Sequence, residues 1–398
     1  MPRIVYDVTN LIRSLTNIPH GVVRVEAAFA EALLENRNKW HIVYVKRNTL
    51  GYLVAVSHRQ LRVALDRTSE LSESKSVFRR ELFRISRRLG LSAIPVLLKK
   101  NDLYVNVGGL DQLSRSWYIE LALSSFKIPY LVYCHDLIPV RYPYLVQSAL
   151  FKSRYKKGVI MSSSAKLVLC NSIYTSADLR EYFSEIGVVN PPVLTLNQLA
   201  SSRLNCVAKT DPGFAVALKG GYILSVGAIS ERKNQDLLLN IWATSENDVF
   251  QKIKLVLVGG AVNGSEIELR KIELDERISS NVVYLEKIND ADLAWLYENC
   301  MFTLYPSLCE GWGLPVGESL AYGKVCVASS TTSVPEVGQG LCVHIDPFDF
   351  VSWRDAIVQL ISDIPLRKAL EDKIKLNFTP RSWQDVGREF LECISRSV

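Results

Sequence analysis

The feature that most constrains the fold is a repeated alternation of short apolar runs with segments of helical periodicity. In the first half of the chain the runs are Arg3–Val8, His41–Lys46, Leu103–Val107, Tyr130–Cys134 and Lys166–Cys170. In the second half they are Tyr222–Val226, Lys254–Val258, Val282–Leu285, Phe302–Tyr305, Val325–Ala328 and Cys342–Ile345. Short strands that alternate with helices favour parallel sheets with helical crossovers. The pattern therefore predicts an α/β fold with two Rossmann-like, parallel-sheet halves.

The length of 398 residues is more than one compact core usually takes, which also favours two domains. We expect an N-terminal Rossmann-like domain at 1–200 and a C-terminal one at 201–380, with an irregular boundary at Thr195–Gly220. The segment 381–398 predicts a last helix, because Trp383, Val386, Phe390 and Ile394 follow helical spacing. Ligands of such sheets bind beyond the carboxyl ends of strands, so we expect the two halves to face a common cleft.

The composition is that of an ordinary globular protein, with 48% hydrophobic and 22% charged residues. The sequence has neither a signal-peptide pattern nor an apolar run of membrane-spanning length, so a cytoplasmic location is expected. Eight scattered cysteines form no C-x-x-C pair. Cys170 and Cys326 lie in strand-like runs, which predicts buried thiols in a reducing compartment.

A basic segment at 78–100 holds seven Lys/Arg and one Glu. Such an amphipathic segment suits the inner face of an anionic cell membrane, which would make the protein peripheral there. It equally suits a helix packed on its own domain with a solvated basic face. Nucleic acid is disfavoured, because few aromatic residues accompany the charges and no binding motif is present.

Two glutamates eight residues apart, Glu310 and Glu318, flank a glycine-rich turn that opens a helix. Pro315 suits the first helical position, and Gly323 is placed to end the helix. The turn would present the backbone amides of Gly313, Leu314 and Val316 to an anion at the positive end of the helix dipole. A capped surface helix with two solvated glutamates is the plain alternative.

A second motif, at 225–236, joins the end of a strand at Gly227 to a helix that begins near Asn234. Arg232 and Lys233 stand just before that helix. Two fixed cations beside a helix N-terminus suit a diphosphate and need no metal. Taken alone, the pair would equally be part of an exposed loop.

Two motifs of the first half also follow strands. His135 and Asp136 leave an apolar strand at its carboxyl end, where a cleft ligand would bind. A histidine satisfied by the backbone is the plain alternative. Gly21 and Arg24 lie where the first strand gives way to a helix, and Arg24 is a candidate contact for an acceptor phosphate. One glycine is also explained by an ordinary turn.

Two further patterns are explained by helix capping. Ser333 and Glu336 fit a capping box. Asp290 and Asp292 resemble the Asp-x-Asp of metal-dependent glycosyltransferases, but they directly precede a helical pattern that they would cap. We therefore predict no metal site.

Together, these motifs resemble the signature of the family-four retaining glycosyltransferases, which have the GT-B fold, and in particular bacterial mannosyltransferases of surface polysaccharide assembly. The resemblance covers most of the second half and parts of the first. It implies that Arg232 and Lys233 stabilise the departing nucleoside diphosphate, while Glu310 holds sugar hydroxyls. It further implies roles for Glu318 at the ribose diol, His135 at the transferred sugar, Asp136 at the acceptor, and Gly21 at the donor phosphate or the acceptor. Many relatives have Arg or Thr where this chain has Ala228.

The resemblance implies a metal-independent retaining hexosyltransferase without a cofactor. Its donor would be GDP-mannose or, next, a UDP-hexose, and its acceptor a glycan carried on a polyprenyl diphosphate. The alternative is a non-catalytic nucleotide-sugar-binding component of a glycan assembly complex. A nicotinamide dehydrogenase is disfavoured, because 258–264 lacks the G-x-G-x-x-G order after its strand.

Overall fold

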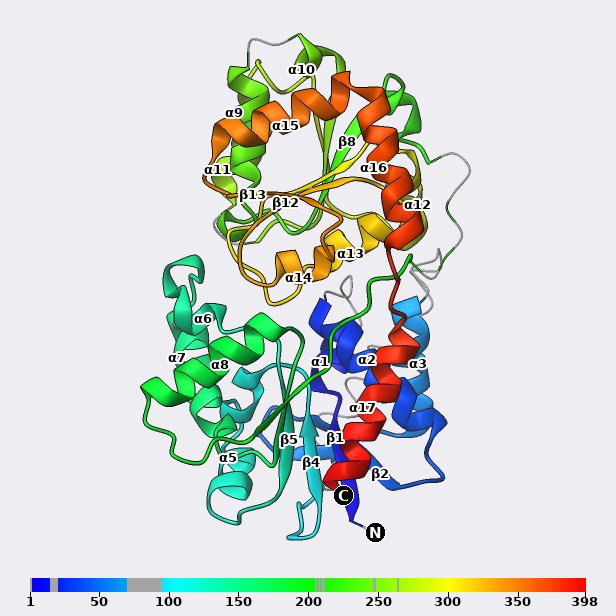
Figure 1. Cartoon of the computed structure of the whole chain (residues 1–398). Coiled ribbons are helices and arrows are strands. Elements are labelled where there is room, and N and C mark those ends of the chain that lie inside the picture. The colour runs from blue at the N-terminus through cyan, green and yellow to red at the C-terminus, as the bar shows by residue number, and fades with distance from the viewer. Residues whose placement is uncertain are drawn as a thin grey trace. The chain divides into compact units, whose positions relative to one another are not determined.

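The computed structural model describes residues 2–14, 21–69, 95–204, 206, 208, 212–245, 248–262 and 265–398 (Figure 1). The chain divides into two compact units. Unit 1 comprises Met1–Leu199 and Trp383–Val398, and unit 2 comprises Ala200–Ser382. Of the basic segment at 78–100, positions 78–94 lie outside the described residues. Both interpretations of that segment stay open.

Within its described residues, unit 1 contains a seven-stranded sheet in the order β3-β2-β1-β4-β5-β6-β7. All neighbouring strands are parallel except the β2–β3 pair. The strands are β1 (Arg3–Asp7), β2 (His41–Arg47), β3 (Leu53–Ala55), β4 (Leu103–Asn106), β5 (Tyr130–Cys134), β6 (Leu167–Cys170) and β7 (Val193–Leu196). Every run predicted for this half forms a strand. The two strands that were not predicted, β3 and β7, lie at the two edges of the sheet, where each pairs with a single neighbour.

The helices of unit 1 follow its strands as crossovers. They are α1 (Thr9–Arg13), α2 (Gly21–Glu35), α3 (His58–Ser69), α5 (Trp117–Ser124), α6 (Ile138–Arg141), α7 (Ala149–Ser162) and α8 (Ile173–Glu185), with the 3-10 turns η2 (Leu110–Ser114) and η3 (Pro143–Leu145). Serine side chains cap several of them: Ser116, Ser148 and Ser172 accept backbone N–H groups at the starts of α5, α7 and α8.

The last helix, α17 (Trp383–Ser397), also belongs to unit 1, where it packs against α2 (Figure 1). Its buried face includes Val386, Phe390 and Ile394, which are three of the positions whose spacing predicted the helix. The Phe390 ring stacks on Phe29 of α2 with ring centroids 4.0 Å apart. The helix therefore covers an apolar face that the first 199 residues leave open.

Unit 2 contains, in its described part, a six-stranded sheet in the order β10-β9-β8-β11-β12-β13. All its pairs are parallel. The strands are β8 (Tyr222–Val226), β9 (Lys254–Val258), β10 (Val282–Leu285), β11 (Thr303–Tyr305), β12 (Cys326–Ser329) and β13 (Val343–Ile345). All six correspond to predicted runs, with bounds that differ by one residue at most.

The helices of unit 2 are α9 (Gln235–Thr244), α10 (Val249–Lys252), α11 (Glu266–Leu274), α12 (Asp290–Asn299), α13 (Leu314–Ala321), α14 (Val334–Gly338), α15 (Phe350–Ser362) and α16 (Ile364–Asn377), with the turns η4 (Ala215–Leu218) and η5 (Glu231–Lys233). They cover both faces of the sheet. Ile223 and Leu224, neighbours on β8, accordingly belong to two different apolar clusters.

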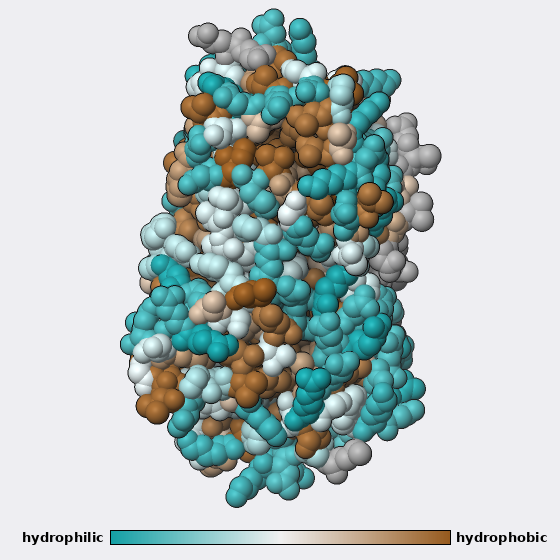
Figure 2. All heavy atoms as spheres, in the orientation of Figure 1, coloured by the Kyte–Doolittle hydropathy of each residue, from teal (hydrophilic) through white to brown (hydrophobic). Residues whose placement is uncertain are grey.

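The surface and the thiols agree with the composition. The face drawn in Figure 2 mixes hydrophilic residues with hydrophobic ones. All eight cysteines lie within the described residues as free thiols, and Cys170 and Cys326 are buried as predicted. None of the described helices combines the length and the apolar content needed to cross a membrane.

Candidate functional site

The carboxyl end of β8 is held very close to the carboxyl end of β9. The Gly227 N–H donates to the Val258 carbonyl at 2.8 Å. Gly259, which follows β9, has a φ of +147°, and a Cβ added there would lie 2.3 Å from the Gly227 carbonyl oxygen. Only glycine fits this position without moving the loop that follows β8.

The Gly259→Ala variant is expected to lose about 3 kcal/mol of unfolding free energy, because it combines a backbone clash with left-handed strain. Gly260→Ala is the matched control, since a Cβ at the next residue meets nothing within 4 Å. Thermal unfolding followed by circular dichroism measures both variants. Equal melting temperatures for the two would show that the close approach is not needed.

The loop after β8 carries Arg232 and Lys233 in η5, directly before α9. Asn234 takes a left-handed φ of 56° between the turn and the helix. Its side-chain amide donates to the carbonyls of Pro306 (3.2 Å) and Pro347 (3.0 Å). These hydrogen bonds fix the backbone next to Arg232 and Lys233, and so the positions from which their side chains project.

Glu310 is the common partner of both cations. Its Oε1 lies 2.6 Å from Lys233 Nζ, and its Oε2 lies 2.7 Å from Arg232 NH1. Lys233 Nζ also donates to the Tyr305 hydroxyl at 2.6 Å. The Lys233 and Glu310 side chains are 12% and 8% exposed, so the pair is largely withdrawn from water. The structure thus brings together three residues that the sequence placed in two separate motifs.

The electrostatics of this group are those of a buried ion pair. Burial would raise the pKa of Glu310, but the positive charges of Arg232 and Lys233 outweigh it and lower that pKa to about 2. Burial lowers the pKa of Lys233, an effect that Glu310 opposes and Arg232 reinforces. The 2.6 Å contact between the two groups supports an ionised pair.

Acid should weaken the fold through this carboxylate. The folded pKa of Glu310, about 2, lies below that of an unfolded glutamate, near 4.3. Its contribution to stability is therefore complete above about pH 4 and is lost as the pH falls towards about 2. We expect the difference in melting temperature between the wild type and Glu310→Gln to shrink between neutral pH and about pH 3. A difference that stays constant would contradict this assignment.

The Glu310 loop is fastened from the segment before α14. The Glu310 N–H donates to Thr332 Oγ1 at 2.9 Å, and Ser333 Oγ donates to the carbonyls of Glu310 (2.9 Å) and Trp312 (3.0 Å). Ser333 makes no side-chain cap on α14, so the predicted capping box is wrong. Its hydroxyl holds the glutamate loop instead. Tyr305 and Thr332 are neighbours of this group that sequence reasoning missed, and Ser333 is one to which it gave a different role.

Helix α13 starts one residue earlier than predicted, at Leu314, so Pro315 is its second residue. Gly313 is its N-cap, with a φ of +115°. The Val316 N–H donates to the Gly313 carbonyl at 3.0 Å, so the expectation that it would face an anion is wrong. Glu318 is the fifth residue of α13 and so lies beyond its first turn. It is buried, and its Oε2 accepts the Tyr297 hydroxyl at 2.9 Å.

The sites predicted in the first half lie in unit 1. His135 follows β5, is 8% exposed, and its Nε2 lies 2.7 Å from the Val107 carbonyl oxygen. Asp136 Oδ1 accepts the Ile138 N–H at 3.0 Å, at the start of α6. Gly21 is the first residue of α2, and Arg24 lies in its first turn, half-buried. Their assigned roles stay predictions.

The Asp290–Asp292 pair has a structural explanation. Asn289 caps α12 by accepting the Asp292 N–H at 2.8 Å, and both aspartates lie in the first turn of that helix. Capping at this place is confirmed, although the capping side chain is that of Asn289. Across the described residues, no cluster of three or more His, Cys, Asp or Glu has the arrangement of a metal site.

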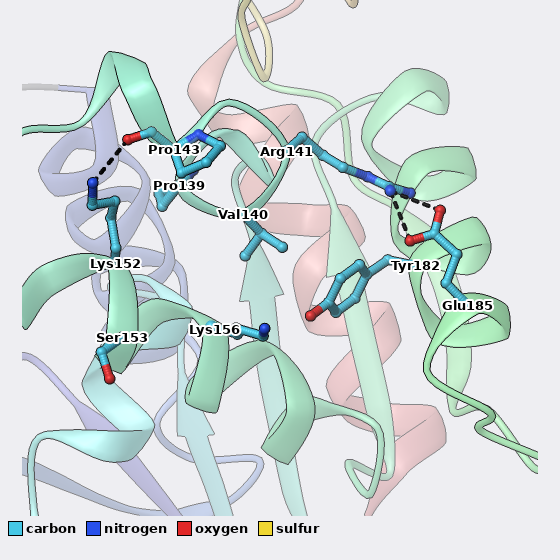
Figure 3. A pocket seen from close by; sticks show the side chains of 9 residues that line it. All are labelled: Pro139, Val140, Arg141, Pro143, Lys152, Ser153, Lys156, Tyr182 and Glu185. Carbon is cyan, nitrogen blue, oxygen red and sulfur yellow. Dashed lines mark hydrogen bonds and ion pairs between the residues drawn. The ribbon is translucent and has the colours of Figure 1, made fainter. Parts of the chain in front are cut away.

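A hollow of about 430 Å³ that sequence reasoning did not predict lies in unit 1 between α6, α7 and α8 (Figure 3). Arg141 binds Asp178 at 2.6 Å and Glu185 at 2.7 Å. Lys152 Nζ donates to the Pro143 carbonyl at 3.1 Å. The arginine charge in this hollow is thus already neutralised by neighbouring carboxylates.

The ion-paired group lies in a part of the chain that matches a known protein family. Residues 210–376 match the family model described as glycosyl transferases group 1. The matched range covers most of unit 2 and less than half of the chain. Arg232, Lys233 and Glu310 all lie inside the matched range, as do Gly227 and α13.

Relatives of the chain include O-antigen enzymes. It is 24% identical over 309 residues to the serotype-specific mannosyltransferase WbdA of Escherichia coli, covering 74% of this chain and 37% of the relative. It is 28% identical over 225 residues to the O-antigen chain mannosyltransferase B of Escherichia coli, covering 56% of this chain and 58% of the relative. The chain thus spans about a third to three fifths of the length of these relatives.

Solved structures show the same architecture over the whole chain. Sucrose-phosphate synthase from Thermosynechococcus elongatus has a TM-score of 0.64 at 17% identity. The aligned region covers 100% of this chain and 99% of the synthase chain. Anabaena HepE in complex with UDP-glucose has a TM-score of 0.65 at 14% identity, with both chains fully covered. The predicted GT-B fold class, with its two parallel-sheet units, is confirmed.

Proposed function

We propose that the protein is a retaining glycosyltransferase that moves a hexose, mannose first, from a nucleotide sugar to a hydroxyl of a glycan acceptor. The proposal places it in bacterial surface polysaccharide synthesis. The match to the glycosyl transferases group 1 family model and the mannosyltransferase relatives support the class of reaction. The complex of HepE with UDP-glucose supports a nucleotide-sugar donor.

The observation that carries the proposal is the sharing of Glu310 between Arg232 and Lys233, at 2.7 and 2.6 Å. A carboxylate accepts sugar hydroxyl protons, whereas guanidinium and ammonium groups bind phosphate oxygens. A nucleotide sugar presents both chemistries next to each other. The group would therefore bind the donor across its glycosyl–phosphate bond.

The chemistry follows from this placement. The glycosyl–phosphate bond would break through an oxocarbenium-like state, and negative charge would develop on the departing diphosphate. Arg232 and Lys233 are fixed before the reaction by Glu310, Tyr305 and the Cys309 carbonyl, so they would stabilise that charge without reorganising. A leaving phosphate oxygen would take the acceptor proton, so that retention needs no dedicated base.

The same two cations would supply the positive charge for which other glycosyltransferases use a divalent metal. We therefore propose metal-independent catalysis with no cofactor. Glu318 would hold the ribose diol, which requires its carboxylate to exchange the Tyr297 hydroxyl for the ligand or to share it. The acceptor would be a glycan on a polyprenyl diphosphate at the inner face of the membrane.

A nucleotide-sugar panel tests the proposal. Purified full-length protein is mixed with GDP-mannose, UDP-glucose, UDP-galactose or no donor, and both melting temperature and nucleotide release are measured. GDP-mannose is expected to give the largest rise in melting temperature and the fastest release, with and without EDTA.

Three outcomes of the panel would count against parts of the proposal. A melting-temperature shift without release or transfer, with acceptor glycan supplied, would favour a non-catalytic binder. Loss of release with EDTA would overturn metal independence. An inverted anomeric configuration in the product, read by proton NMR, would overturn retention.

A further inference from the structure

Unit 1 contains a buried arginine without a carboxylate partner. Arg47 ends β2 and is only 6% exposed. Its guanidinium donates to the Gln112 side-chain oxygen at 2.7 Å and to the Gln112 carbonyl at 3.2 Å, both of which are neutral. Among the residues that the structure describes, no acidic side chain forms an ion pair with Arg47. A buried arginine in a folded protein is usually paired.

A second arginine joins the first through a chain of hydrogen bonds. Gln112 Nε2 donates to Asp111 Oδ2 at 3.2 Å, and Arg115 Nε forms a salt bridge with the same oxygen. Asp111 is 4% exposed, whereas the Arg115 side chain is 31% exposed. The Asp111 carboxylate is thus the one acidic group in the hydrogen-bonded series Arg47–Gln112–Asp111–Arg115. The Arg115 end of this series reaches the surface.

A third arginine approaches from α1. Arg13 is the last residue of that helix, α1 packs against β2, and Arg47 ends β2. Burial, followed by the charges of Arg47 and Arg115, lowers the pKa of Arg13. Its side chain is partly covered but reaches the surface, and the negative charge of Asp7 acts on it in the opposite direction. Within the described part of the chain, no carboxylate forms a salt bridge with it. We call Arg13, Arg47 and Arg115 the arginine cluster.

The three guanidinium groups repel one another, and only the carboxylates of Asp111, which is directly bonded to Arg115, and Asp7 offset their charge. A further anion at this place would relieve that repulsion. We propose that the arginine cluster binds a phosphate-bearing ligand. Planar guanidinium groups bind phosphate oxygens in bidentate fashion, which suits a group with several oxygens better than a single carboxylate. Arg13 and Arg115 contact the phosphate oxygens, while the buried Arg47 contributes its positive charge without touching the ligand.

The cluster lies at the carboxyl end of the unit 1 sheet, because Arg47 ends β2 in parallel register with β1. Ligands of parallel sheets bind at this edge. The phosphate is therefore that of the acceptor, and this assignment rests on the proposed function. Two sources share this chemistry: a phosphate or diphosphate ligand taken from solution, and the headgroup of an anionic lipid.

In the test, the full chain is titrated with inorganic pyrophosphate, and isothermal titration calorimetry measures the dissociation constant. All proteins carry Lys233→Ala, which removes one of the two unit 2 cations that would bind the same probe. The contribution of the other, Arg232, is then the same in every protein and cancels in the comparison. Arg13→Gln is compared with Arg13→Lys and with Arg180→Gln, an exposed arginine of α8 in the same unit. Loss of one charge-assisted phosphate contact predicts roughly tenfold weaker binding for Arg13→Gln. Arg13→Lys should bind with intermediate strength, and Arg180→Gln as the parent does.

A second arm uses flotation of the same proteins with vesicles of phosphatidylcholine, with and without phosphatidylglycerol. Weaker pyrophosphate binding by Arg13→Gln alone assigns the site to a phosphate ligand from solution. Loss of binding to the anionic vesicles alone assigns it to a lipid headgroup. The proposal is overturned if Arg13→Gln and Arg180→Gln bind equally in both arms, or if the parent binds neither probe. Donor hydrolysis by the wild type tests the proposed function separately.

Discussion

Replacing Lys233 by alanine is expected to lower donor turnover by roughly 100- to 1,000-fold, because a preorganised charge is removed from the departing diphosphate. Lys233 Nζ lies 2.6 Å from both Glu310 Oε1 and the Tyr305 hydroxyl, so its position is fixed before any ligand binds. Glu310 keeps Arg232 as a partner in this variant. The fold should therefore survive, and circular dichroism would show it.

The matched control is Lys271→Ala in the same unit. Lys271 also pairs with a carboxylate, that of Asp236, but the two side chains are 34% and 41% exposed. Surface pairs of this kind contribute little to stability, about 1 kcal/mol at most. Turnover at saturating donor should stay near wild type for Lys271→Ala. A normal kcat for Lys233→Ala would remove the lysine from the proposed mechanism.

Replacing Glu310 by glutamine should change binding and turnover in opposite directions. The carboxylate neutralises Arg232 and Lys233 in the unliganded protein. Without it, a nucleoside diphosphate meets an additional uncompensated positive charge, which is worth about 1.4 kcal/mol or roughly tenfold in affinity. Turnover should nevertheless fall by roughly 100-fold, because the sugar loses a charged hydroxyl acceptor.

Calorimetry with GDP and UDP, combined with turnover assays, measures both effects. Glu231→Gln is the matched control, since Glu231 is exposed and begins the same η5 turn, yet forms no ion pair in the described structure. It should leave both quantities near their wild-type values. If Glu310→Gln bound the nucleoside diphosphate more weakly than the wild type, the carboxylate would not oppose the phosphates as proposed.

Much of the fold could be predicted because buried parallel strands are recognisable in the sequence as apolar runs. Tyr130–Cys134, Tyr222–Val226 and Lys254–Val258 were predicted with the bounds that the structure has. The edge strand β7, Val193–Leu196, was missed although three of its four residues are apolar, because it is short and overlaps the irregular boundary expected at Thr195–Gly220. The central strands could be predicted because both of their faces are buried, which requires apolar residues at successive positions.

The candidate site was only partly predictable for a different reason. Arg232, Lys233 and Glu310 could be named because each stands beside a strand or helix boundary. Their mutual contacts could not, since Lys233 and Glu310 are 77 positions apart and meet only through the order of β8 and β11 in the sheet. The Ser333 hydroxyl satisfies a local capping pattern in the sequence, yet a distant loop takes its hydrogen bond. A local sequence pattern does not show that a distant carbonyl competes with the helix N-terminus for the same hydroxyl group.

The place of α17 in unit 1 also affects how the chain is made. Residues 200–382 form one uninterrupted unit, whereas unit 1 needs both the first 199 residues and the last 16. During synthesis the second unit can therefore complete its core before the first can. Phe29 and its apolar neighbours on α2 lack their Phe390 contact until residues 383–398 have been synthesised. The usual order, in which the N-terminal domain folds first, is reversed for the final step of this protein.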